Sequence, residues 1–332
     1  MSKNNRLLMA SLIGAGVLFS ACSKHDVDEI IQKPYEGEKV VEDVIEIIPE
    51  EVVFKALYEK QEAEEVEEPI DENTIEFNTT EIETIVDLNR TPIYDSINEK
   101  NIIGYFVPNR KFDFSFETDN WNAINYYGDT GYVLKNDTYT STRRIMNIDM
   151  IDKGYVKVKT PIYDNYDLEG AYFVLSELEF VEIYKELDNC YLVQTIDHLG
   201  FIPKDNVEFL PGNVAVVDRS NQELRLYEGN TMTICTPVVT GTKDTDRESD
   251  LGLFEVRLQA ENLYIVPGSW VDCVTYYNKG EGIHTAEWRT TQEFGGDTYL
   301  TNGSHGCINT PHDEALYVHK TLTLGDKVLV KE

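Results

Sequence analysis

Short stretches in which apolar and polar residues alternate recur along this 332-residue chain. Lys111–Phe116 and Tyr155–Lys159 are the clearest, and a period of two is typical of β-strands with one buried face. Closer to the C-terminus, two apolar runs flank a polar stretch at 219–222, which predicts a β-hairpin with strands at 213–218 and 223–227. We expect further strands at 233–240, 271–277 and 325–330. The pattern therefore predicts a mainly β protein.

The sequence also predicts one short helix, which begins near residue 310. Thr310 is a good N-cap, Pro311 suits the first helical position, and Asp313 stands where a capping-box acid would. A helix that begins there would bring its partial positive charge close to Cys307. Such a charge favours the thiolate form of a cysteine.

An internal repeat fills residues 82–210. Three short segments recur with a common offset of 69 residues, and they lie at 91–95 and 160–164, at 119–121 and 188–190, and at 131–133 and 200–202. A fixed period of this kind predicts two copies of one small unit, which we place at 82–140 and 141–210.

Each copy resembles a bacterial SH3-like barrel. The features that carry the resemblance are an early Thr-Pro-Ile-Tyr turn, a Gly-Tyr step at Gly104, a strand tryptophan at Trp121 and a closing Gly-Tyr-Val. The second copy has Cys190 in place of the tryptophan, which puts its ligand groove in doubt. The resemblance implies either recognition of the cell wall by exposed aromatic side chains or a spacer whose aromatics are core, and both stay open.

The N-terminus has the pattern of an export signal. Lys3 and Arg6 precede the apolar stretch 7–19, which is too short to span a membrane comfortably, and Ser20-Ala21-Cys22 follows. Residues 1–22 resemble a bacterial lipoprotein signal with Cys22 as the lipidated residue. The alternative is an uncleaved signal-anchor. Both place the rest of the chain on the outer face of the cytoplasmic membrane or in the cell envelope.

The segment 23–81 is strongly acidic. It holds 20 Asp or Glu against 5 Lys, about half of the formal net charge of −31. Like charges repel and extend a chain, so we predict a largely disordered tether. It is either a spacer that lifts the rest of the chain from the membrane or a solubilising tail. The acidity argues against a nucleic-acid partner, because little here would neutralise phosphates.

The hexapeptide 304–309 carries the chemistry. Cys307 is a nucleophile, His305 lies two residues before it, and His284 lies upstream. A histidine can remove the thiol proton or favour the thiolate. Gly306 lacks a Cβ and lets the backbone turn sharply. The amides of Gly306 and Cys307 are candidates to hold a developing oxyanion.

Together, Ser-His-Gly-Cys-Ile-Asn at 304–309 and the preceding His284 resemble the signature of the L,D-transpeptidase (YkuD-type) catalytic domain. The Val-Val-Thr-Gly step at 238–241 matches the opening of that family, whereas the usual Thr-Pro before the next strand is missing at 249–254. The resemblance implies a β-sandwich-like catalytic domain at 211–332. We treat the missing Thr-Pro as a loop variation.

The resemblance also implies roles for individual residues. Cys307 would attack the carbonyl of the third residue of a tetrapeptide stem, and His284 would take the thiol proton and protonate the departing D-Ala. A side-chain amine of a neighbouring stem would then resolve the thioester. The remaining roles are orientation of His284 by the carbonyl of Thr285, shaping of the site by His305, Ser304 and Gly306, and substrate contacts from Tyr276, Trp288, Arg289 and Asn309.

Three alternatives remain at this stage. The same domain could use water as acceptor, as an L,D-carboxypeptidase. A papain-like wall peptidase is disfavoured, because there the cysteine precedes its histidine in the chain. The third is a non-enzymatic wall-binding lipoprotein. We expect no metal and no cofactor, since no Cys/His set has zinc spacing and His312 and His319 are predicted to lie on the helix surface. Cys235 and Cys273 either pair or are plain buried residues.

Overall fold

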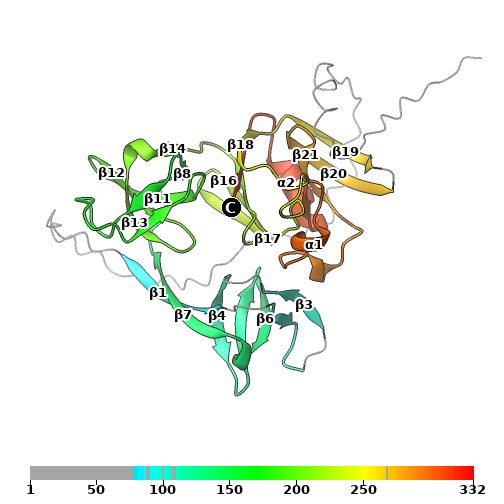
Figure 1. The fold of residues 1–332 in the computed structure, drawn as a ribbon, viewed down its shortest axis with the longest axis horizontal. Helices are drawn as coiled ribbons and strands as arrows, with labels where there is room; N and C mark the ends of the chain where they lie inside the picture. The colour runs from blue at the N-terminus through cyan, green and yellow to red at the C-terminus, as the bar shows by residue number, and fades with distance from the viewer. Residues whose placement is uncertain (1–77, 87–89, 99–100, 107–109, 267) are drawn as a thin grey trace, which may run out of the picture.

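The computed structural model describes residues 78–332 except for 87–89, 99–100, 107–109 and 267 (Figure 1). The predicted signal, Cys22 and most of the acidic tether lie outside the described residues. Within the described part of the chain, no helix has the length and apolar character needed to cross a bilayer. Strands dominate, as the alternating pattern predicts.

The first unit is a seven-stranded sheet in the order β3-β2-β6-β5-β4-β1-β7. Trp121 is buried in it, beside the edge-on ring of Tyr94. The elements are β1 (Thr79–Val86), β2 (Pro92–Tyr94), β3 (Ile102–Tyr105), β4 (Lys111–Glu117), β5 (Trp121–Tyr126), β6 (Asp129–Leu134), the 3-10 turn η1 (Lys135–Asp137) and β7 (Tyr139–Met146).

The second unit repeats this order of elements. β4, β5 and η1 begin 69 residues before β11, β12 and η2. Cys190 begins β12 where Trp121 begins β5, and both side chains are buried. The elements are β8 (Asp152–Val156), β9 (Thr160–Ile162), β10 (Phe173–Leu175), β11 (Phe180–Glu186), β12 (Cys190–Gln194), β13 (Leu199–Pro203), η2 (Lys204–Asn206) and β14 (Val207–Phe209). The SH3-like class and the domain boundaries stay predictions.

The C-terminal part is a two-sheet sandwich, as expected. One sheet has the order β17-β16-β15-β23-β18 and the other β19-β20-β21-β22. Its elements are β15 (Val214–Asp218), β16 (Glu223–Glu228), β17 (Thr231–Pro237), β18 (Gly252–Glu255), β19 (Leu258–Val266), β20 (Ser269–Asn278), β21 (Glu281–Thr285), η3 (Thr291–Glu293), α1 (Tyr299–Asn302), β22 (Ile308–Thr310), α2 (His312–Thr321) and β23 (Lys327–Lys331).

Alternation along the strands builds the core of the sandwich. One buried cluster joins Leu224 and Leu226 of β16 to Ile283 of β21, Ile308 of β22 and Val318 of α2. The helix α2 and the five-stranded sheet β17-β16-β15-β23-β18 therefore cover the same face of the four-stranded sheet (Figure 1). The opposite face of β20, β21 and β22 is left for other side chains, and these include the chemically reactive ones.

The second unit covers the outer face of the five-stranded sheet. Phe180 packs against Tyr227 with ring centroids 4.9 Å apart, in a cluster that also holds Val216 and Leu329. Lys331 adds polar contacts, with its Nζ 2.9 Å from Asp218 and 3.3 Å from a carboxylate of the second unit. The second unit therefore shares a hydrophobic core with the C-terminal sandwich.

A buried ion pair ties the first unit to the same sheet. Arg110 pairs with Glu223 at the start of β16, and Arg225 lies 2.7 Å from the other carboxylate oxygen. Burial alone would raise the pKa of Glu223, but Arg110 and then Arg225 outweigh it and hold the pKa at about 2. The stabilisation from this charge is therefore present above the ordinary pKa of a glutamate and is lost as the pH falls toward 2.

Two predictions about the helix are wrong. α2 begins at His312 with Pro311 as its N-cap, and Thr310 ends β22, where its hydroxyl donates to the carbonyl of Ile308. The parallel pairing of β22 with β21 extends the strand through Thr310 and delays the helix. His319 is not a surface residue, because its Nδ1 lies 3.0 Å from the Thr275 hydroxyl under the helix.

Glu223→Gln is expected to destabilise the protein by about 3–5 kcal/mol, because it leaves the buried guanidinium of Arg110 and the partly buried one of Arg225 without their counter-charge. The midpoint of thermal unfolding should fall by roughly 6–20 °C. Glu248→Gln is the matched control, since Glu248 pairs with Arg219 at a more exposed position and should cost less than about 1 kcal/mol. Equal midpoints for the two variants would contradict a role for Glu223 in joining the units.

Candidate active site

The parallel pair β21–β22 places the predicted reactive residues together. His284 pairs with Asn309, and Ile283 pairs with Ile308. Successive side chains of a strand point to opposite faces, so His284, Asn309 and Cys307 share one face while Ile283 and Ile308 turn into the core. Two segments more than twenty residues apart thus present the histidine and the cysteine on the same side of one sheet.

His284 is held in one tautomer by its neighbours. Its Nδ1 lies 2.7 Å from the carbonyl oxygen of Thr285, which can only accept, so Nδ1 carries the proton. Nε2 lies 3.1 Å from the side-chain nitrogen of Asn309 and accepts from it. Burial lowers the pKa of His284 to about 4; the Thr285 carbonyl opposes this shift and the charge of Arg289 adds to it. The ring is therefore neutral at pH 7 and its lone pair is on Nε2.

Arg289 orients Asn309. Its Nε donates to the Asn309 side-chain oxygen at 2.7 Å, which turns the amide nitrogen toward His284. The other guanidinium nitrogens contact Asn302 and Glu293 at 3.0 and 3.5 Å, and the side chain is only 5% exposed. The structure thus gives Arg289 internal partners, whereas the sequence suggested a substrate carboxylate. Asn309 likewise contacts the histidine ring from within the protein.

Ser304 closes the turn that carries the cysteine. Its Oγ donates to the carbonyl of Cys307 at 2.5 Å and accepts the amide of Gly306 at 3.0 Å. Gly306 has φ of +113°, and a Cβ there would lie 2.9 Å from a carboxylate oxygen of Glu281. Only glycine fits this position. The Gly306 amide, predicted as an oxyanion donor, is thus engaged by Ser304.

Cys307 lies at the bottom of this turn. The residue is 2% exposed, and its Sγ donates to the carbonyl of Gly280 at 3.5 Å. The thiol is therefore shielded from bulk solvent.

The other predicted residues lie at different depths. His305 is exposed, and burial first, then Arg247, lowers its pKa. Trp288 is 45% exposed, and its ring centroid lies 5.8 Å from that of His284. Tyr276 is buried on the same sheet face beside Gly282, in the apolar cluster of β19 and β20. Trp288 and His305 thus lie at the surface of the site, and Tyr276 forms part of its wall.

Sequence reasoning missed the support beneath the turn. Ser249 accepts the amide of Gly241 at 2.9 Å and donates to the carbonyl of Gly306 at 2.8 Å. Glu281 is buried and accepts the amide of Asp250 at 3.0 Å. The segment in which the family's Thr-Pro is absent is therefore hydrogen-bonded to the turn that precedes Cys307. A buried acid next to His284 in β21 was the signal that could have found it.

The four cysteines of the described residues are all free, so Cys235 and Cys273 do not pair. Burial, the first cause in each case, raises the pKa of both thiols to about 12. Cys273 is buried and Cys235 partly buried, whereas Cys307 directly precedes the strand that pairs with the strand of His284.

Residues 212–330 match the family model described as the L,D-transpeptidase catalytic domain, YkuD. The match covers just over a third of the chain and coincides with the sandwich and the site on β21 and β22. It supports a transpeptidase role for this domain. No curated protein matches the sequence.

Solved structures of L,D-transpeptidases are also similar in part. One from Stackebrandtia nassauensis is 24% identical with a TM-score of 0.32, and the match covers 36% of this chain and 56% of that one. The catalytic domain from Enterococcus faecium is 29% identical over 36% of this chain and 96% of its own, with a TM-score of 0.32. One from Mycobacterium tuberculosis is 19% identical over 46% and 76%, with a TM-score of 0.32. The chain thus spans little more than half of the Stackebrandtia protein, and the family model carries the assignment.

Arg289→Gln is expected to raise the pKa of His284 from about 4 toward its ordinary value of 6.5, because the positive charge that disfavours the imidazolium is removed while a side chain that can donate to Asn309 is kept. Histidine-labelled NMR across pH measures the shift directly. The resonance of His198, in the second unit, is the internal control. A His284 pKa that stays at its parent value would contradict the electrostatic influence of Arg289.

Proposed function

We propose that the domain at 212–330 is a peptidoglycan L,D-transpeptidase in which Cys307 is the nucleophile. The observation that carries the proposal is the parallel register of β21 and β22, which puts Cys307 on the same sheet face as a histidine with a neutral ring. Family members act on the stem peptides of peptidoglycan. Cys307 would form a thioester with the third residue of a tetrapeptide stem and release the terminal D-Ala.

His284 acts as the general base. The Thr285 carbonyl fixes the proton on Nδ1, so Nε2 is the nitrogen that accepts the thiol proton as Sγ attacks the carbonyl carbon. In the resting site the side-chain amide of Asn309 donates to the lone pair of Nε2, and this hydrogen bond must break when Nε2 accepts the thiol proton. The imidazolium then gives this proton to the nitrogen of the departing D-Ala. The neutral ring regenerates for the second step.

The developing oxyanion requires donors at the turn. The Gly306 amide must leave the hydroxyl of Ser304 in order to bind it, and Ser304 retains the carbonyl of Cys307. The acceptor in the second step is a side-chain amine of a neighbouring stem, which forms a cross-link between third residues. Water as acceptor would make the same site an L,D-carboxypeptidase, and the product analysis below separates the two.

We assign the remaining segments of the chain to export and to positioning of the catalytic domain. We propose that the N-terminal signal exports the protein, that Cys22 carries a lipid, and that the acidic tether and the two SH3-like units position the domain in the envelope. The outer sheet face covered by Phe180 and its neighbours supports a fixed rather than free arrangement of the second unit on the domain. A non-enzymatic wall-binding lipoprotein is the competing function.

Incubation of the full chain in detergent with disaccharide-tetrapeptide should give a Cys307-dependent product by mass spectrometry. A cross-linked dimer that has lost one D-Ala establishes transpeptidation, and tripeptide without dimer establishes hydrolysis. Cys307→Ala should abolish both. Cys273→Ala removes another buried free thiol and should keep the product. Equal product from the parent and Cys307→Ala, or none from either, would move the assignment to a wall-binding lipoprotein.

The rate of D-Ala release should stay high below pH 6 and fall only as the pH drops toward 4. The reason is that the base is His284, whose folded-state pKa is about 4, and protonation of Nε2 removes its function. A stopped assay over pH 3.5–8 with short incubation measures the acidic limb. An acidic limb centred near 6.5 would indicate an exposed histidine as the base and would contradict the assignment to His284.

A further inference from the structure

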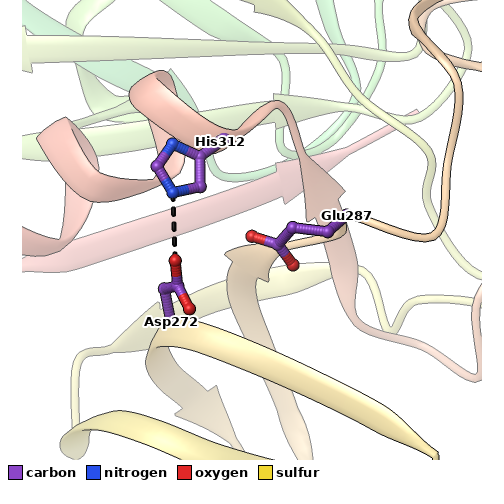
Figure 2. A group of neighbouring side chains, drawn as sticks. All are labelled: Asp272, Glu287 and His312. Atoms are coloured by element: carbon purple, nitrogen blue, oxygen red, sulfur yellow. Dashed lines mark hydrogen bonds and ion pairs between the residues drawn. The ribbon is translucent and has the colours of Figure 1, made fainter.

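Three potential metal ligands converge at one end of the four-stranded sheet. Asp272 comes from β20, Glu287 lies two residues after β21, and His312 begins α2 just after β22. One ligand atom from each lies within 4.8 Å of the others. Figure 2 shows the imidazole of His312 above the carboxylate of Asp272, with Glu287 reaching toward both from the side. Their spacing along the sequence does not match a metal-binding motif. Only the pairing of strands in the sheet brings them together.

The ligand atoms face one another. Nε2 of His312 lies 3.1 Å from a carboxylate oxygen of Asp272, and both side chains are close to half exposed. Metal–ligand distances of about 2.0–2.2 Å bring ligand atoms to roughly 3.4 Å from one another around a tetrahedral ion. Glu287 is exposed, so its side chain can change rotamer without disturbing the core.

Two of the three side chains are also hydrogen-bonded to groups outside the cluster. Nδ1 of His312 lies 2.7 Å from a carboxylate oxygen of Asp313. The indole Nε1 of Trp270 donates to Oδ1 of Asp272 at 2.9 Å. A histidine ligand typically donates its second ring nitrogen to a carboxylate, and a ligating carboxylate is typically hydrogen-bonded in turn. Both partners leave Nε2 and Oδ2 turned toward the shared centre.

Acidic side chains dominate the charge around this centre. Three carboxylates, Asp272, Glu287 and Asp313, surround the single imidazole of His312. One imidazole among three acidic side chains gives the group a negative charge that a divalent ion would offset.

We propose that Asp272, Glu287 and His312 bind a divalent metal ion, with water completing the coordination. One imidazole nitrogen and two carboxylate oxygens are a donor set that suits Zn²⁺. The proposal does not depend on the transpeptidase assignment.

The metal site is joined to the histidine of the candidate active site through Thr285. The backbone amide of Asp272 donates to the hydroxyl of Thr285 at 2.9 Å, and the carbonyl of the same threonine accepts from Nδ1 of His284 at 2.7 Å. Glu287 is followed directly by Trp288, whose ring lies beside His284. A metal ion that fixes Asp272 and Glu287 therefore stiffens the strand end that positions His284, without contacting the reacting atoms.

Isothermal titration of the metal-free full chain in detergent with ZnCl₂ tests the proposal. The parent should bind one equivalent that His312→Gln and Asp272→Asn each weaken at least tenfold, and Trp270 fluorescence should change with the same stoichiometry. Asp313→Ala removes the outer partner and should weaken binding roughly tenfold. His198→Gln, a histidine in the second unit, is the matched control and should bind as the parent does.

Folding of each variant is checked by its thermal midpoint without metal. If His312→Gln is destabilised, Glu287→Gln replaces it, because Glu287 is exposed, and it should show the same direction of change. Zn²⁺ should raise the midpoint of the parent and not that of the ligand variants. Absence of a saturable equivalent in the parent, or equal binding by the parent and all ligand variants, would overturn the proposal and assign any uptake to other acidic groups.

Discussion

The parallel pairing of β21 with β22 is the constraint on which the candidate site depends. It fixes His284 opposite Asn309, and through the alternation of side chains it places Cys307 on the same face. Parallel strands need a long connection, and here that connection contains η3, α1 and the turn that ends in Gly306. The histidine can therefore precede the cysteine by more than twenty residues and still share its environment. A slip of one residue in this register would turn Cys307 into the core.

Burial determines the chemistry at this register. His284 is 1% exposed and Cys307 2%, so neither charged form is stabilised by water. The low pKa of His284 disfavours a resting imidazolium, and the site accordingly begins from a neutral ring and a sheltered thiol. In the proposed mechanism, charge develops only when a substrate carbonyl is present to share it. If Cys307 is the nucleophile, as proposed, its burial protects it from side reactions but requires donors for the oxyanion at the moment of attack.

The sequence predicts the parts of the molecule that depend on local pattern. The hairpin at 214–228, the closing strand and the hexapeptide follow from alternation and motif, and the structure contains the corresponding strands. Contacts between residues far apart in the chain could not be predicted from the sequence. Whether Gly306 offers its amide depends on the rotamer of Ser304, and the burial of His319 depends on Thr275 two strands away. Thr310 shows the same limit, because its good capping propensity is overridden by strand pairing.

Thr285 connects the two chemical centres of the domain. Its carbonyl sets the tautomer of His284, and its hydroxyl receives the amide of Asp272 from the neighbouring strand. A threonine with both groups engaged cannot rotate without losing one of these bonds, and each buried bond lost would cost about 1–3 kcal/mol. The orientation of the His284 ring is thus determined by the strand end as a whole. Any ion or proton that draws Asp272 toward His312 acts on the same backbone, so the electrostatics of the exposed cluster and the geometry of the buried histidine are properties of one structural element.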